Sequence, residues 1–109
     1  MRVEFDKMEE ITMEHFKGGE GVMHAKMFTN ELGKILMGRL EPGSSIGLHT
    51  HDTSSEIIYI FSGKAKVIDD GEEYFYGPGE VHYCPKGHSH TMISVGDEDL
   101  KIFAVIPEQ

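Results

Sequence analysis

Short stretches rich in β-branched and aromatic residues, separated by turn-forming residues, make up most of the chain from residue 15 onward. The clearest stretches are residues 22–28, 34–40, 56–61, 65–68, 73–76, 81–84, 90–95 and 100–106. Glycine, proline and short polar residues separate them, and these residues favour turns. Residues 1–14 mix apolar and charged positions and give no clear prediction. Because no helical pattern exceeds about two turns, we predict about nine or ten strands in an all-β sandwich or barrel.

Two of these stretches, residues 57–61 and 102–106, are apolar on both faces of the predicted strand. A strand in an antiparallel sheet with one solvated face alternates between apolar and polar residues instead. We therefore expect both strands to be covered twice, by the core on the inside and by another element or subunit on the outside. This pattern predicts a homodimer.

Composition restricts the class of protein further. The 109 residues are enough for one domain, and the formal net charge is −9 with the basic residues scattered, which argues against a nucleic-acid partner. No apolar run approaches the ~20 residues of a membrane span, and the first residues lack the apolar core of a signal peptide. We expect a cytoplasmic protein without a membrane partner. The single cysteine, Cys84, fits a reducing compartment and is expected to be a buried, inert thiol.

Three histidines and a glutamate form the candidate functional site. His49 and His51 are two residues apart on a predicted strand, so their side chains project from the same face. Glu56 opens the next strand, and His90 begins a later strand, so only tertiary packing can bring all four together. Imidazole and carboxylate ligands suit Mn, Fe, Ni, Cu or Zn better than Ca²⁺ or Mg²⁺. These four residues therefore predict one divalent transition metal.

The spacing of the first three candidate ligands resembles the first motif of the cupin superfamily. The motif opens at Gly43 and closes at Gly63, with five residues before His49 and six after Glu56. One residue separates the two histidines, and four separate His51 from Glu56. The chain matches the family pattern at each of these positions.

The fourth ligand stands in a segment that is similar to the second cupin motif. Gly79, Pro85, Gly87 and His90 have the family's order and spacing. The motif usually closes with Asn, but this chain has Ser94 at that position. The substitution spares the metal ligands and puts one hydrogen bond of the family pattern in doubt.

The resemblance implies a single cupin domain over residues 1–109, folded as a double-stranded β-helix or jelly-roll barrel of the RmlC-like type. The barrel core is expected at about residues 34–106, with strands in residues 1–33 completing the barrel or a dimer interface. The resemblance also implies a homodimer and one divalent metal, of an identity that the sequence leaves open. The implied ligands are His49, His51, Glu56 and His90.

Two functions are compatible with such a site. The first is an enzyme that acts on a small oxygenated metabolite (a keto acid, dicarboxylate or sugar) by decarboxylase, isomerase or dioxygenase chemistry, with His82 as the candidate general base. The alternative is a non-catalytic module that binds a metal and a small molecule or sugar. A titratable non-ligand group beside the metal would favour the enzyme, and a cavity lined only by ligands and apolar residues would count against it. Further residues could line the cavity or merely pack elsewhere: His82, His88, Met92, Tyr59 and Arg39.

Overall fold

The computed structural model describes residues 1–109 and consists almost entirely of β-strands. The elements in chain order are η1 (Phe5–Lys7), β1 (Ile11–Glu14), η2 (Phe16–Gly18), β2 (Val22–Asn30), β3 (Gly33–Leu40), β4 (Ser45–Thr50), β5 (Glu56–Ser62), β6 (Ala65–Asp69), β7 (Glu72–Tyr76), β8 (Val81–Cys84), β9 (Ser89–Ser94) and β10 (Leu100–Pro107). The η elements are short 3₁₀ turns, and no helix is long and apolar enough to cross a membrane. The predicted all-β fold is confirmed.

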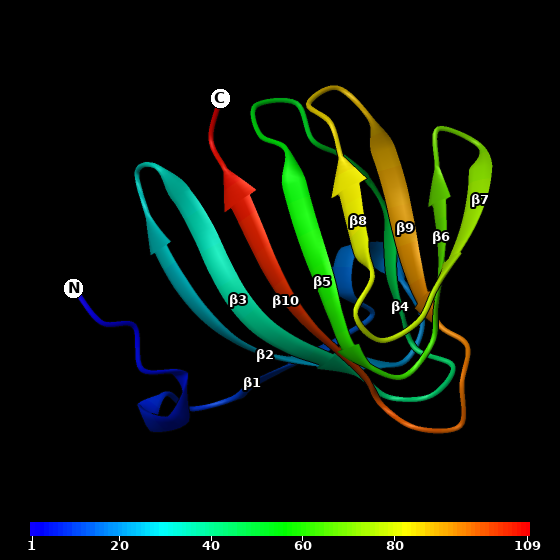
Figure 1. The fold of residues 1–109 in the computed structure, drawn as a ribbon, viewed down its shortest axis with the longest axis horizontal. Helices are drawn as coiled ribbons and strands as arrows, with labels where there is room; N and C mark the ends of the chain where they lie inside the picture. The colour runs from blue at the N-terminus through cyan, green and yellow to red at the C-terminus, as the bar shows by residue number, and fades with distance from the viewer.

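The strands form two antiparallel sheets that face each other (Figure 1). The six-stranded sheet has the order β1-β2-β3-β10-β5-β8, and the four-stranded sheet has the order β4-β9-β6-β7. Neighbours in a sheet are mostly distant in sequence, and the chain crosses between the sheets repeatedly, as in a jelly-roll barrel. The strands of residues 1–33 extend the larger sheet through the pairing of β1 with β2 and of β2 with β3.

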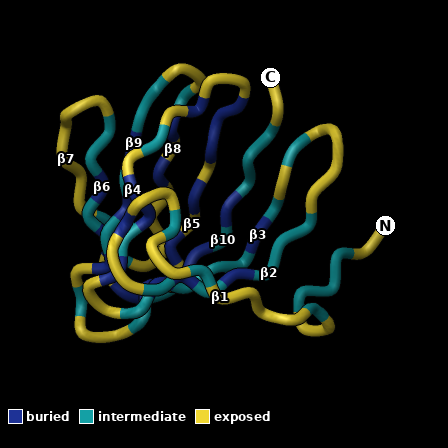
Figure 2. The backbone as a smooth tube through the Cα atoms, turned by 180° about the vertical axis from the view of Figure 1, so that it is seen from behind, coloured by how far each residue is buried: buried dark blue, intermediate teal, exposed yellow.

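Apolar side chains from both sheets meet in one core. The thirteen buried members of the cluster are Met23, Ala25, Leu36, Leu40, Ile46, Ile58, Ile60, Ala65, Val67, Met92, Leu100, Ile102 and Ala104. Figure 2 shows the buried positions along the inner strands, with the turns at both ends exposed. This core holds the two sheets together and supports the strands that carry the four candidate ligands.

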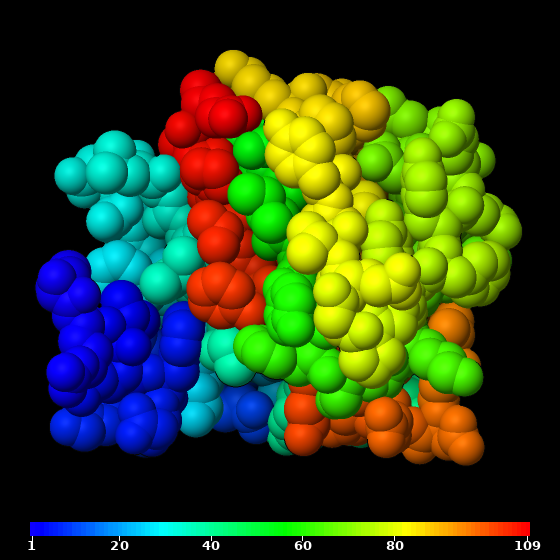
Figure 3. Space-filling view, viewed as in Figure 1, coloured from blue at the N-terminus to red at the C-terminus, as the bar shows by residue number.

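The outer face of the six-stranded sheet carries a second set of apolar side chains. On β5 the buried residues Ile58 and Ile60 alternate with Ile57, Tyr59 and Phe61, which are 41%, 38% and 47% exposed. The chain itself covers only part of this face, where Phe5 of η1 packs edge-on against Phe103 with ring centroids 6.3 Å apart. Figure 3 shows β10, β5 and β8 side by side on this face, next to the N-terminal segment.

One close backbone approach fixes η2 against the edge of the smaller sheet. Gly47 on β4 lies so near the carbonyl of Lys17 that a Cβ at this position would collide with it. Gly19 has the same relation to the carbonyl of Ser45. Because no other residue fits there, these glycines hold the η2 turn beside β4 and its histidines.

Candidate metal centre

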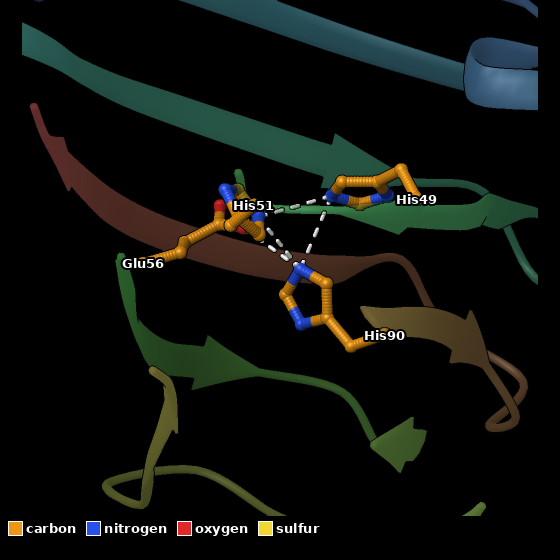
Figure 4. Close-up of side chains that lie close together, drawn as sticks. All are labelled: His49, His51, Glu56 and His90. Atoms are coloured by element: carbon orange, nitrogen blue, oxygen red, sulfur yellow. Dashed lines mark hydrogen bonds and ion pairs between the residues drawn. The ribbon is translucent and has the colours of Figure 1, made fainter. Parts of the chain in front are cut away.

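The four candidate ligands converge from both sheets (Figure 4). His49 lies on β4 directly opposite His90 on β9, and Glu56 is the first residue of β5. His51 follows the end of β4, where its backbone N–H donates to the carbonyl of His88 and its own carbonyl accepts from Gly87. The turn before β9 therefore fixes the position of His51.

The ligating atoms lie at nearly equal separations. His51 Nε2 is 3.0 Å from Glu56 Oε1, 3.0 Å from His90 Nε2 and 3.2 Å from His49 Nε2. His90 Nε2 is 3.1 Å from His49 Nε2 and 3.0 Å from Glu56 Oε1. Two atoms at right angles around an ion, each about 2.1 Å from it, are about 3.0 Å apart. The four residues therefore fit one transition-metal ion.

The other ring nitrogens of these histidines have partners that orient them. His49 Nδ1 donates to the carbonyl of Gly47 at 2.8 Å, which leaves its Nε2 as a free lone pair. His51 Nδ1 contacts Ser54 Oγ at 3.0 Å, and His90 Nδ1 contacts His82 Nε2 at 3.0 Å. With Nδ1–H donating in each case, three lone pairs and a carboxylate oxygen point at one another. A cation between them would relieve their mutual repulsion.

Burial and charge favour the ligating protonation states. Burial raises the pKa of Glu56, but hydrogen bonds from His51 and His90, when their Nε2 atoms carry the proton, outweigh this effect and lower the pKa to about 2. Burial lowers the pKa of His49 below its usual value. At neutral pH the carboxylate is therefore ionised and the His49 imidazole is neutral.

A hydrogen-bonded chain leads through His82 away from the four candidate ligands His49, His51, Glu56 and His90, which we call the quartet. This residue is 1% exposed, with its Nε2 bonded to His90 and its Nδ1 3.0 Å from the Tyr76 hydroxyl. Burial lowers the pKa of His82 to about 4. His82 therefore points inward, toward His90. Its partner, however, is Nδ1 of His90, the ring nitrogen that points away from the other ligands. His82 also does not line the cavity that opens onto the quartet.

A cavity of about 360 Å³ opens onto the quartet. It is lined by Phe16, Lys17, Met23, Met27, Lys34, Leu36, Ile46, His49, Thr50, His51, Asp52, Thr53, Ser54, Glu56, Ile102, Ile106 and Glu108. Three of the four candidate ligands line it, so a bound ion would be accessible from this side. The titratable non-ligand groups in the lining are Lys17, Lys34, Asp52 and Glu108, and all four residues are exposed.

The remaining candidate residues lie elsewhere. Arg39 and Tyr59 project from the outer face of the six-stranded sheet, because their inward-facing neighbours on the same strands are the buried Leu40 and Ile58. Arg39 forms ion pairs of 2.9 Å there with Glu10 and Asp99. Of the two possibilities left open for Arg39 and Tyr59, packing away from this cavity is the one that the structure shows.

Two other candidates also have roles away from the cavity. His88 Nδ1 lies 2.9 Å from an Asp69 carboxylate oxygen, which raises the pKa of His88. Met92 is 1% exposed and belongs to the apolar core. Neither residue lines the cavity.

Sequence reasoning missed three groups that support the quartet: the Gly47 carbonyl, the Ser54 hydroxyl and Tyr76. Ser54 lies in a polar run that reads as an ordinary loop. Only its position three residues after His51 offers a signal. The hydrogen bond left in doubt by Ser94 is indeed missing, because Ser94 Oγ is buried without a partner.

Comparison with known proteins agrees with this fold and identifies the family. The cupin domain model matches residues 36–106, so the chain belongs to the cupin family. An oxalate-binding protein of Thermotoga maritima is 32% identical over 109 residues, covering 92% of this chain and 90% of the relative. The crystal structure of a predicted oxalate decarboxylase from Thermotoga maritima aligns over 100% of both chains with a TM-score of 0.93 and 28% identity.

A more distant similarity extends to a larger enzyme. A 5-aminosalicylate 1,2-dioxygenase of a Comamonas species is 32% identical over 69 residues, which are 63% of this chain but only 18% of that relative. The proteins that this chain resembles thus have different names and activities, and the chemistry of this chain must be argued from its own residues.

Proposed function

We propose that this cupin binds a small carboxylate at a divalent transition metal held by His49, His51, Glu56 and His90. The observation that carries the proposal is that five of the six separations among the four ligating atoms are 3.0–3.2 Å, which fits one ion. A metal of this kind acts as a Lewis acid and accepts oxygen ligands in its remaining positions. The metal identity stays open among Mn, Fe, Ni, Zn and Cu.

The similarity to an oxalate-binding protein supports a carboxylate as the ligand. The open side of the quartet faces the cavity through His49, His51 and Glu56, so a ligand that enters there can approach the ion directly. The chain's own residues orient the imidazoles and exclude water from the back of the site, where His82 and His90 are 1% and 2% exposed.

Binding is better supported than turnover. The candidate general base, His82, is hydrogen-bonded to the far nitrogen of His90 and does not line the cavity. A general base must reach the proton that it abstracts. The titratable non-ligand groups of the cavity are all exposed. A general base for decarboxylation or isomerisation would have to come from these exposed groups.

We further propose that the protein is a homodimer that pairs through the outer face of the six-stranded sheet. The support is the exposed apolar set on β5 and β8, which includes Ile57, Tyr59, Phe61, Val81 and Tyr83. Soluble monomers rarely expose contiguous apolar patches of more than a few hundred Å².

Calorimetric titration with oxalate tests the proposed function. We expect oxalate to bind Mn(II)-loaded protein with a stoichiometry of one, and to bind neither metal-free protein nor the His49→Ala, His51→Ala double variant. The His15→Asn, His88→Asn double variant is the matched control, since neither imidazole contacts the four candidate ligands, and should bind as the wild type does. Equal binding with and without metal would overturn the proposal. Formation of formate and carbon dioxide from oxalate would overturn the assignment as a binder and favour a decarboxylase.

A further inference from the structure

The cavity beside the quartet is larger and more apolar than a simple dicarboxylate requires. Its volume is about 360 Å³. Even at the roughly 30 Å³ that one water molecule occupies in the liquid, the six non-hydrogen atoms of oxalate fill only about half of such a space. A ligand that fills the cavity must carry further atoms beyond the group that reaches the metal.

Apolar side chains form much of the lining. The seven hydrophobic lining residues are Phe16, Met23, Met27, Leu36, Ile46, Ile102 and Ile106. Water against such walls is displaced favourably by apolar groups of a ligand. Met23 and Met27 can adapt to the shape of the ligand, because methionine side chains are flexible and polarizable. The further atoms of the ligand are therefore apolar.

The charged groups of the cavity limit the number of carboxylates. Two cations, Lys17 and Lys34, line the cavity, and so do two anions, Asp52 and Glu108. These four formal charges cancel, so the cavity offers no surplus positive charge to a second carboxylate away from the metal. One carboxylate at the ion is the arrangement that fits this balance.

We infer that the ligand is a 2-oxo or 2-hydroxy monocarboxylate with an aliphatic or aromatic side chain, and not oxalate itself. The inference rests on the proposed function, because the carboxylate and its neighbouring oxygen would bind the metal that His49, His51, Glu56 and His90 would hold. The side chain of the ligand lies against the apolar wall that includes Met27, Leu36 and Ile106.

A ligand series tests this substrate class on Mn(II)-loaded protein. Calorimetric titration should give affinities that rise about fourfold for each added methylene from pyruvate through 2-oxobutanoate to 2-oxopentanoate. We also expect 4-methyl-2-oxopentanoate to bind more tightly than oxalate. A flat series, or oxalate as the tightest ligand, overturns the inference but leaves metal-dependent carboxylate binding intact. If no member of the series, oxalate included, binds the loaded protein, the proposed function fails as well.

A polar substitution in the apolar wall separates side-chain recognition from metal binding. Met27 lies on β2 and is only partly buried, so Met27→Gln keeps its length and should leave the fold intact. This variant should bind 4-methyl-2-oxopentanoate about tenfold more weakly, with oxalate affinity and metal content unchanged. Met37→Gln is the matched control, because Met37 does not line this cavity. Equal loss for both ligands, or no loss for either, contradicts the inference.

Discussion

The Nδ1 atom of His90 lies 3.0 Å from the Nε2 atom of His82, deep between the two sheets. For His90 to offer its Nε2 lone pair to a metal, its Nδ1 must carry the proton and donate it to His82. The proton on His82 then lies on Nδ1 and is donated to the Tyr76 hydroxyl oxygen, at 3.0 Å. His82 therefore positions a ligand imidazole and selects its tautomer.

Removal of the His82 acceptor should weaken metal binding. We expect His82→Leu to lower the affinity for Zn(II) about 10–100-fold in competition with a chromophoric chelator, because the buried His90 N–H loses its partner. His82→Gln offers a carbonyl oxygen in the same region and should recover most of the affinity. Tyr76→Phe should have a smaller effect in the same direction. Tyr74→Phe is its control, since the Tyr74 hydroxyl donates to exposed Glu72 instead. Unchanged affinity in His82→Leu would contradict this role.

The orphaned hydroxyl of Ser94 predicts a stabilising substitution. Ser94 is 1% exposed and its Oγ has no hydrogen-bond partner. A buried hydroxyl without a partner costs about 1–3 kcal/mol, so Ser94→Ala should raise the free energy of unfolding by about 1 kcal/mol. Urea denaturation followed by circular dichroism measures the change.

Ser44 supplies the matched control for this substitution. Its side chain is also buried, but its Oγ accepts a hydrogen bond of 2.9 Å from the Val22 backbone N–H. Ser44→Ala should therefore lower the free energy of unfolding by about 1 kcal/mol. Equal destabilisation by both substitutions would show that Ser94 Oγ has a hydrogen-bond partner in solution, which contradicts the prediction.

The exposed apolar face predicts self-association. Light scattering should give a mass of about twice the 12.2 kDa of the chain. Tyr59→Glu places a charge at the centre of this face and should yield the monomer, because burial of an unpaired charge opposes association. Leu48→Glu is the control, since Leu48 is exposed on the four-stranded sheet and should leave the dimer intact. A wild-type mass equal to that of one chain would refute the interface.

The buried thiol of Cys84 predicts a pH-dependent reactivity. Burial raises the pKa of Cys84 from its ordinary value to about 12, and the residue is 0% exposed. Only the thiolate reacts with alkylating reagents, so a raised pKa means slower reaction at every pH below it. Native protein should react with iodoacetamide at pH 8 at least about a hundredfold more slowly than protein unfolded in guanidinium chloride. Similar rates in the two states would show that the thiol is accessible.

Local patterns were sufficient to predict much of the fold, whereas the convergence of the four candidate ligands was implied by the resemblance to cupins. The predicted strand of residues 81–84 coincides with β8, and the parity of His49 and His51 correctly places them on one face. The same parity argument, applied to Tyr59, would have placed it opposite Ile58, on the outer face. β1 escaped prediction because its residues are mostly exposed and carry no core pattern.

The partners of the ligands depend on tertiary register and could not be read from the chain. Tyr76 reaches His82 although they lie in different sheets, since β7 pairs with β6 and β8 pairs with β5. The Gly47 carbonyl accepts a hydrogen bond from His49 because of the local backbone geometry of β4. The residue types in this strand do not predict that geometry. Side-chain periodicity predicts which face of a strand a residue occupies, but not which atom of another strand it contacts.

The metal content of the purified protein tests the central claim most directly. Elemental analysis of the wild type and of the His15→Asn, His88→Asn control should each give close to one transition-metal ion per chain. The His49→Ala, His51→Ala variant should give almost none after the same exposure to Mn(II), because it lacks two of the four ligands. Stoichiometric metal in the His49→Ala, His51→Ala variant would contradict the assignment of the quartet.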